Sequence, residues 1–312
     1  MSKPIIVGYD PKTSDRAPVN FAVAAARFTG APLVVASVCA GDAARRRGDA
    51  ARMDEDLPAD ASGALGEVAG ELQAEGIAVE YTELENTSAA RALHEAAEAQ
   101  DAGLLVVGST NRGAIGRVLP GSTAERLMHG APCPIAIVPH GWEAGGGLGT
   151  IGVAYVDTDE GREALRGAHA LARRAGAKLR VLTAVKAGLS AFGETEATTA
   201  VQPGKGVTEI EGELRTQAED ALRRETEALA DGVPLETDAF VEDPADVLIR
   251  VSEHLDLLVC GSRGYGPLRA VLLGGVSRRL AADARCPVIV LPRGVKDSLE
   301  ALMSEMPRAA AG

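Results

Sequence analysis

The segment ARFTGAPLVVASV at residues 26–38 returns, with changes, as ARRAGAKLRVLTAV at residues 172–185, which is 146 residues further along the chain. Two later blocks return 153 residues further along: LLVVGS at 104–109 as LLVCGS at 257–262, and APCPIAIVP at 131–139 as ARCPVIVLP at 284–292. The blocks keep their order, and only the middle of the second copy is longer. This pattern is typical of an internal duplication.

The duplication sets the expected domain organisation. The chain has 312 residues, more than the roughly 100 to 200 residues of one domain. Between the copies, HGWEAGGGLGT at 140–150 is rich in glycine and has no periodicity, which is typical of a linker. We therefore expect a first domain at 1–141, a linker at 142–149, a second domain at 150–293 and a C-terminal tail at 294–312.

Each copy alternates short apolar runs with longer helical stretches. In the first copy the runs predict strands near 4–9, 32–39, 77–84, 103–108 and 133–138, and helices near 14–29, 63–75, 87–100 and 122–130. The strands are apolar on both faces, as in a buried parallel sheet. Alternating strands and helices favour an α/β fold with a doubly wound parallel sheet in each copy. We expect irregular loops at 40–62 and 186–212.

Composition and charge exclude several function classes. Apolar residues make up 46% of the chain and aromatic residues 3%, so Val, Leu, Ile and Ala must fill the cores. A net charge of −12 argues against nucleic acid and anionic membranes as partners. No apolar run approaches the roughly 20 residues of a membrane span, and the first residues do not resemble a signal peptide. We expect a cytoplasmic protein.

Cysteines and histidines offer no pattern typical of catalysis or metal binding. Cys39, Cys133, Cys260 and Cys286 lie far apart and predict buried, reduced thiols. The five histidines are scattered, and the pair His94 and Glu98 is typical of a solvated helix face. Neither a G-x-S-x-G nor an HExxH motif is present. We therefore assign neither a catalytic residue nor a metal site.

Two loops compete for the ligand position of such a sheet, which lies outside the carboxyl ends of its strands. One loop follows the first strand, from Tyr9 to Asp15. The other follows the fourth strand, from Gly108 to Thr123, and its counterpart in the second copy runs from Gly261 to Ser277. These later loops are glycine-rich and lead into a helix, where backbone N–H groups favour an anion such as phosphate. They are not P-loops, because Ala114 and Ile115 replace the required Lys and Ser or Thr.

The glycine loops resemble the signature of the universal stress protein family: Gly, two residues, Gly, nine residues, Gly, then Ser or Thr. In the second copy Gly261, Gly264 and Gly274 have this spacing, with Gly275 at the hydroxyl position and Ser277 two residues on. In the first copy Gly108, Gly121 and Ser122 fit, and Asn111 takes the place of the second glycine. The resemblance covers nearly the whole chain, since the order of elements also matches.

The resemblance implies a sheet order of 3-2-1-4-5 in each copy and, in the nucleotide-binding branch of the family, a bound ATP, with or without Mg²⁺. The acid after the first strand would contact the nucleoside, the end of the second strand the adenine, and the glycine loop the phosphates. Carried onto the first copy, the site residues are Asp10, Val38, Gly108, Asn111, Gly113, Gly121, Ser122 and Thr123. In the second copy they are Ala184, Gly261, Gly264, Gly274, Gly275, Val276 and Ser277.

One departure separates the two copies. Val156 occupies the position that Asp10 has in the first copy, which removes an acceptor for the ribose, so we expect the first copy to be the better nucleotide site. Structural interpretations stay open for individual residues. Ser122 and Glu125 form a capping box that can simply start a helix, and Asp10 precedes Pro11 as in many turns.

The function that the resemblance implies is a stress-linked sensor or regulatory module that binds an adenine nucleotide. Two alternatives stay open: a weak enzyme that hydrolyses the nucleotide, and an interaction protein whose sites bind nothing. The final strand of each copy is bounded by prolines, which suits a sheet edge. We therefore expect the two copies to pair through these edges as an intramolecular pseudo-dimer, with a further homodimer as an option and the protein partner unknown.

Overall fold

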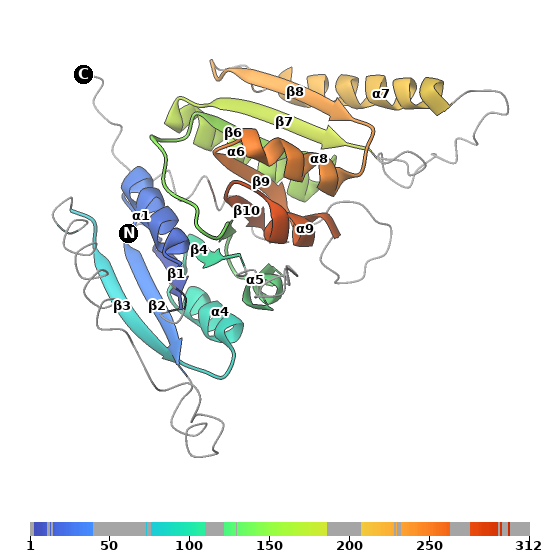
Figure 1. Ribbon diagram of the computed structural model, residues 1–312. Helices are drawn as coiled ribbons and strands as arrows, with labels where there is room; N and C mark the ends of the chain where they lie inside the picture. The colour runs from blue at the N-terminus through green and yellow to red at the C-terminus, as the bar shows by residue number, and fades with distance from the viewer. Residues whose placement is uncertain are drawn as a thin grey trace. The chain divides into compact units, whose positions relative to one another are not determined.

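The computed structural model divides the chain into a first unit, Met1–Ala144, and a second unit, Gly145–Glu300. The structure describes residues 3–10, 13, 15–39, 73, 76–109, 122–128, 130–185, 207–227, 229, 232–262, 275–292, 294 and 299. Figure 1 labels the elements, and each unit is described by itself below.

The first unit contains five parallel strands in the order β3-β2-β1-β4-β5. The strands are β1 (Ile5–Tyr9), β2 (Leu33–Cys39), β3 (Val79–Glu85), β4 (Leu104–Gly108) and β5 (Ile135–Val138). The helices described are α1 (Ala17–Thr29), α4 (Ala89–Ala99) and α5 (Ser122–Met128). The predicted order 3-2-1-4-5 is confirmed.

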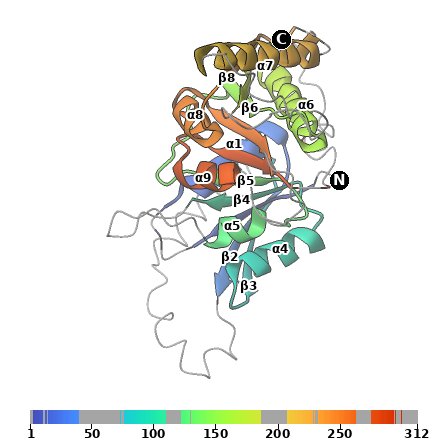
Figure 2. The same ribbon diagram turned by 90° about the vertical axis from the view of Figure 1, so that its right-hand side faces the viewer.

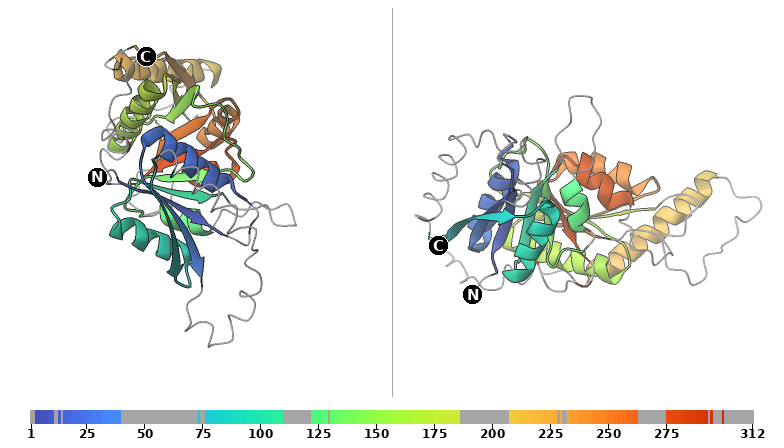
Figure 3. Two further views of the ribbon diagram at one scale, coloured as in Figure 1. Left: turned by 90° about the vertical axis from the view of Figure 1, so that its left-hand side faces the viewer. Right: turned by 90° about the horizontal axis from the view of Figure 1, so that it is seen from below.

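Helices cover both faces of this sheet. A Cβ atom on Gly8 would meet Leu93 of α4 and the side chain of Val107, whereas a Cβ on Gly108 would meet Pro18 of α1. Successive strand residues point to opposite faces, so α4 and α1 lie on opposite sides. Helix α5 packs beside α4 (Figure 2), and α1, in blue, lies across β1 and β4 (Figure 3, left).

The second unit repeats this topology, with five parallel strands in the order β8-β7-β6-β9-β10. The strands are β6 (Thr150–Ala154), β7 (Lys178–Ala184), β8 (Leu235–Phe240), β9 (Leu257–Gly261) and β10 (Val288–Leu291). The helices are α6 (Asp159–Ala175), α7 (Val207–Glu227), α8 (Pro244–Val251), the short 3-10 turn η2 (Ser252–His254) and α9 (Gly275–Asp283). Figure 1 shows α7 alongside β8.

Local sequence explains where the helices begin and end. Helix α1 has Pro18 in its first turn and ends at Gly30, whose φ of 70° is the left-handed conformation that glycine adopts freely. Helix α6 begins after Thr158, whose hydroxyl accepts the Gly161 N–H at 3.0 Å, and its first turn contains two acidic residues. These are the usual start and stop signals of helices.

The predicted strands and helices of the first copy agree with the structure within a few residues where it describes them. The predicted loop at 40–62 lies outside the described residues. The predicted helix at 63–75 also lies outside them, except for Gln73. The prediction of irregular structure at 186–212 is wrong for 207–212, because these residues form the start of α7. Residues 186–206 lie outside the described ranges.

Aliphatic side chains fill both cores, as the low aromatic content predicts. The largest side chains that are fully buried are Ile5, Ile6, Leu33, Leu105, Leu127, Ile135, Ile137, Ile151, Leu179, Leu182 and Leu222. Most of them belong to the central strands, which bury both faces. Among the described residues, no helix combines the length and apolarity needed to cross a bilayer.

Candidate functional site

The carboxyl ends of β1, β2 and β4 form the edge of the first unit where a ligand is expected. Tyr9 pairs with Ser37 and Val7 pairs with Val106, so these three strands run in register. Asp10 follows β1 directly and is exposed, whereas Val38 in β2 and Gly108 at the end of β4 are half-buried. The topology therefore brings Asp10, Val38 and Gly108 to neighbouring strand ends.

Other predicted residues of this site are described in part or not at all. Asn111, Gly113 and Gly121 lie outside the described residues. Ser122 is the first residue of α5, but its side chain is not described, so its role as a cap stays a prediction. Thr123 is half-buried in the same turn. The structure thus fixes the two ends of the glycine loop, Gly108 and the start of α5.

Gly108 lies close to the start of α1. A Cβ atom at this position would lie 3.1 Å from Cγ of Pro18 and 3.9 Å from Oδ2 of Asp15. The first contact is tighter than an ordinary van der Waals contact, so a side chain at 108 would push on α1. Close packing therefore favours glycine here, in addition to any ligand.

Beside Gly108, three polar residues from three segments form a cluster that we call the Asp15 cluster: Asp15, Ser109 and His140. The Asp15 side chain is only 9% exposed, and its Oδ2 lies 2.9 Å from Nδ1 of His140. Oδ1 of Asp15 accepts the N–H groups of Ala17 at 3.1 Å and of Gly141 at 3.3 Å. The backbone N–H of His140 donates to Oγ of Ser109 at 3.1 Å.

Sequence reasoning missed this cluster. Asp15 stood within the loop from Tyr9 to Asp15 but received no role, and His140 was treated as one of five scattered histidines. A signal was present, because Ser109 directly follows β4 and His140 lies two residues after β5. Adjacent parallel strands end at the same edge, so residues after their ends meet.

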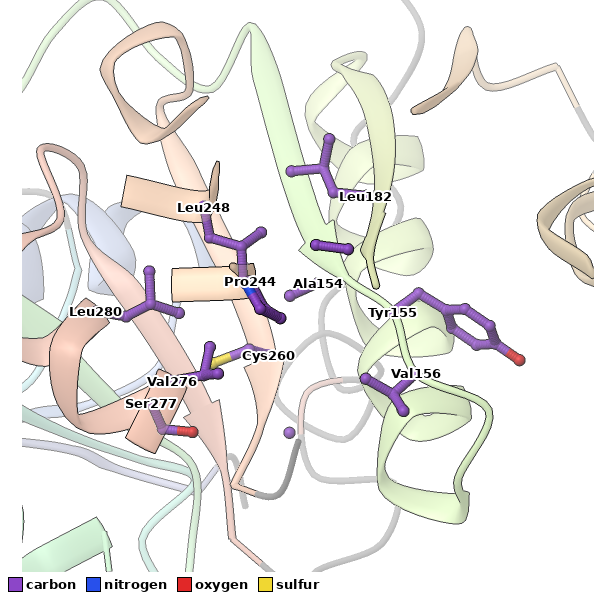
Figure 4. A pocket seen from close by; sticks show the side chains of 13 residues that line it. Ala154, Tyr155, Val156, Leu182, Pro244, Leu248, Cys260, Val276, Ser277 and Leu280 are labelled. Carbon is purple, nitrogen blue, oxygen red and sulfur yellow. The ribbon is translucent and has the colours of Figure 1, made fainter. Parts of the chain in front are cut away.

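The corresponding edge of the second unit contains a small hollow (Figure 4). It is lined by Ala154, Tyr155, Val156, Gly161, Leu182, Ala184, Pro244, Leu248, Cys260, Gly261, Val276, Ser277 and Leu280. Four residues predicted for the second nucleotide site, Ala184, Gly261, Val276 and Ser277, therefore do meet. Gly275 lies next to them at the exposed start of α9, and Gly264 and Gly274 lie outside the described residues.

The hollow is narrow and mostly apolar. Its volume is about 30 Å³, enough for a water molecule or two. In Figure 4, Val156, Cys260 and Val276 border it with carbon and sulfur atoms. Burial raises the pKa of the Cys260 thiol to about 12, so this group stays protonated and offers no charge to a ligand.

The strand register confirms that Val156 is the counterpart of Asp10. Ile5 pairs with Leu33 and with Leu104, and Ile151 pairs with Leu179 and with Leu257, the matching residues of the repeat. Val156 follows Ile151 at the same distance at which Asp10 follows Ile5. The second unit therefore has an aliphatic side chain where the first has a carboxylate.

A second difference lies at the start of α6. Helices α1 and α6 end at the equivalent glycines Gly30 and Gly176, yet α1 has 13 residues and α6 has 17. The additional turn of α6 is at its N-terminus, beside β9. A Cβ on Gly261 would lie 3.2 Å from Cβ and 3.4 Å from the carbonyl group of Glu160. Backbone of α6 thus packs against the first residue of the second glycine loop.

Arginine side chains link the helices that border each site through hydrogen bonds and ion pairs. In the second unit Arg279 of α9 donates to the Asp243 carboxylate at 2.9 Å and also pairs with Asp246, both at the start of α8. In the first unit Arg126 of α5 donates to Oγ of Ser88, the residue before α4, at 3.5 Å. These contacts hold the helix that follows each glycine loop.

The remaining thiols and acids show no further centre. Cys133 and Cys286 are buried, and burial raises the pKa of each thiol to about 12, whereas Cys39 is half-buried. Within the described ranges, no group of three His, Cys, Asp or Glu residues is arranged to hold a metal ion.

Comparisons with known proteins give the relatives of the chain. The sequence model of the Universal stress protein family matches residues 1–139 and 147–292. A universal stress protein of Mycobacterium tuberculosis is 28% identical over 234 residues, which are 70% of this chain and 74% of that protein.

A solved structure of a family member shows the same fold. A universal stress protein from Archaeoglobus fulgidus aligns over 94% of this chain and 97% of its own, with 19% identity and a TM-score of 0.61. A universal stress protein solved in complex with cAMP covers 46% of this chain and 97% of its own, with 21% identity and a TM-score of 0.33.

Proposed function

Because this chain belongs to the universal stress protein family, we propose that its first unit binds an adenine nucleotide, in the first place ATP, and that the protein works as a stress-linked sensor or regulatory module. One observation carries the proposal: Asp10, Val38 and Gly108 lie at neighbouring strand ends. This is the position at which doubly wound sheets bind ligands.

Each group has a chemical role in the proposal. The Asp10 carboxylate accepts a hydrogen bond from a ribose hydroxyl, a charge-assisted contact. The backbone around Val38 meets the adenine. The loop from Gly108 to Thr123 offers backbone N–H groups to the phosphates at the start of a helix, with or without Mg²⁺. The residues Asn111, Gly113, Gly121 and Ser122 keep the roles that the family resemblance implies.

The first unit is the proposed site because the second lacks the acceptor that the ribose requires. The Val156 side chain cannot accept a hydrogen bond. The residues Ala184, Gly261, Gly264, Gly274, Gly275, Val276 and Ser277 then form a related but narrow hollow. We propose that it stays unoccupied at nucleotide concentrations that fill the first unit.

Charge supports the remaining part of the proposal. A chain with a net charge of −12 is repelled by phosphodiester backbones and anionic lipids. We therefore propose that the protein acts in the cytoplasm through its small-molecule ligand and a protein partner.

Calorimetric titration of the full chain with ATP tests the site. We expect about one nucleotide per chain. The Asp10→Asn variant keeps the shape of the side chain but loses its charge, so affinity should fall about tenfold, which is the difference between a charged and a neutral hydrogen bond. Glu80→Gln in β3 makes the same chemical change at an exposed position and should leave binding unchanged.

The outcomes separate the alternatives. Binding without release of phosphate supports a sensor, and steady phosphate release would show an enzyme. A wild-type protein that binds no ATP at millimolar concentration would refute the proposal. Equal loss of affinity in Asp10→Asn and Glu80→Gln would show that Asp10 does not contact the nucleotide.

A further inference from the structure

His140 sits on a rigid turn beside the proposed nucleotide site. The Trp142 N–H donates to the Pro139 carbonyl at 3.1 Å, which closes the turn after β5. The Trp142 ring packs edge-on against Phe21 of α1, with 5.6 Å between ring centres. Together with the bond from the His140 N–H to Ser109, these contacts fix the backbone that carries the imidazole.

The ring itself is oriented by Asp15. Its Nδ1 lies 2.9 Å from the buried carboxylate, while the His140 side chain is 50% exposed. A carboxylate accepts only, so Nδ1 must carry a proton. Among the described residues, Nε2 has no hydrogen-bond partner. The other polar contact around His140 comes from Ser109 at the end of β4, and Asp15 is the charged group that faces the ring.

The position of this pair matters because Asp15 adjoins Gly108. Its Oδ2 would lie 3.9 Å from a Cβ on that glycine, which opens the proposed phosphate loop. A buried carboxylate alone would repel a phosphate. With the ring protonated, the carboxylate is neutralised and Nε2 becomes a second donor, which suits a phosphate oxygen on the solvent side.

We propose that His140, held by Asp15, donates a hydrogen bond as an imidazolium to a phosphate of the bound nucleotide, so that binding takes up a proton. The inference rests on the proposed nucleotide site and adds a ligand contact to it. His140 touches the ligand, and Asp15 is a positioning residue that orients and charges the ring.

The repeat itself provides a comparison. By the offsets of the matching blocks, Gly161 stands in place of Asp15 in the second copy, and Arg293, which lies outside the described residues, stands in place of His140. At the position of Asp15 the second unit thus has no carboxylate, although Glu160 lies beside Gly261. The Asp15 cluster belongs to the unit that also keeps Asp10.

The test is calorimetric titration of ATP into the full chain at one pH, in two buffers with different heats of ionisation. The wild type should take up a fraction of a proton more per ATP than His140→Gln does. The difference between the two proteins is the readout, because a terminal phosphate also titrates near neutral pH. His140→Gln should bind about tenfold to hundredfold more weakly, the range for a lost charge-assisted bond.

Two further variants separate a ligand contact from a structural role. His140→Arg keeps a cation without a titrating ring, so it should restore much of the affinity but not the proton uptake. Asp15→Asn keeps acceptors for the Ala17 and Gly141 N–H groups but loses the charge. Its affinity and its proton uptake should both fall, because the ring loses the carboxylate that stabilises an imidazolium.

His94→Gln is the matched control. His94 is also half-exposed in the first unit, and its Nε2 lies 4.0 Å from Glu98 on α4. This variant should keep both the affinity and the proton uptake of the wild type.

Three results would overturn the inference. Equal affinity and proton uptake in the wild type and His140→Gln would do so while leaving the Asp10 site intact. Weaker binding by His140→Gln with unchanged proton uptake and a lowered melting temperature would assign His140 a structural role alone. No ATP binding by the wild type would overturn both the inference and the proposed function.

Discussion

At Gly161, in the first turn of α6, the structure predicts a large loss of stability when a single methyl group is added. A Cβ atom at this position would lie 1.9 Å from the carbonyl oxygen of Val156, whereas ordinary van der Waals contact begins near 3.4 Å. The oxygen belongs to the backbone and cannot rotate away. In Gly161→Ala the first turn of α6 must therefore move by about 1.5 Å relative to the end of β6.

Three effects set the size of the change. Replacing Gly by Ala within a helix normally stabilises by about 0.5–1 kcal/mol. Overpacking costs about 1–3 kcal/mol, and moving the turn also breaks the cap from Thr158 to the Gly161 N–H, worth about 1 kcal/mol. The unfavourable effects are larger, so we expect a net loss of about 2 kcal/mol in the free energy of unfolding.

Urea unfolding of the full chain, followed by circular dichroism, measures this loss. Gly212→Ala is the matched control, because Gly212 lies exposed in α7 and a Cβ there would meet nothing within 4 Å. That variant should unfold at a urea concentration equal to or above that of the wild type. If Gly161→Ala is as stable as Gly212→Ala, the first turn of α6 does not pack against Val156 as described.

Three other predictions follow from the same contacts. Val156→Asp should not add a second nucleotide per chain in calorimetry, because the hollow at this edge has a volume of only about 30 Å³; a stoichiometry near two would contradict this. At pH 8 iodoacetamide should label Cys39 first by mass spectrometry, because thiols with a pKa of about 12, such as Cys133 and Cys286, are thiolate in only about one molecule in 10⁴. The same raised pKa values stabilise the fold below pH 9, and this contribution is lost toward pH 12, by up to about 1.4 kcal/mol per pH unit for each buried thiol. The urea midpoint should therefore fall above pH 9, and less steeply in Cys286→Ala; a midpoint independent of pH would refute the assignment.

Much of the fold could be predicted because the strands carry a strong signal. Runs such as those around Ile5, Leu105 and Ile135 are apolar on both faces, which is typical of parallel strands covered by helices on both sides. The duplication supports the same elements a second time, since matching blocks of sequence are expected to form matching strands and helices. The order of strands followed from the family resemblance, and periodicity alone would not have given it.

The earlier start of α6 has a local sequence signal that the offset between the copies does not contain. In the first copy Pro18 suits the first turn of a helix and sets the start of α1. In the second copy Thr158 followed by two acidic residues is a capping signal one turn earlier. The constant offset of 146 residues matches Gly30 with Gly176 and Asp15 with Gly161, but it does not predict that the second helix begins one turn earlier.

The Asp15 cluster could not be predicted from local sequence, because its members come from segments that only the topology joins. Asp15 and His140 are 125 residues apart, and neither lies in a motif. Their contact needs β1, β4 and β5 to end at one edge and α1 to begin there with Pro18 against Gly108.

Both copies keep the strands and their register, so the sheet alone does not distinguish the two units. The differences gather at the carboxyl edge, at Asp10 against Val156 and at Asp15 against Gly161. Substitutions at this edge change the groups offered to a ligand and leave the strands and their register unchanged.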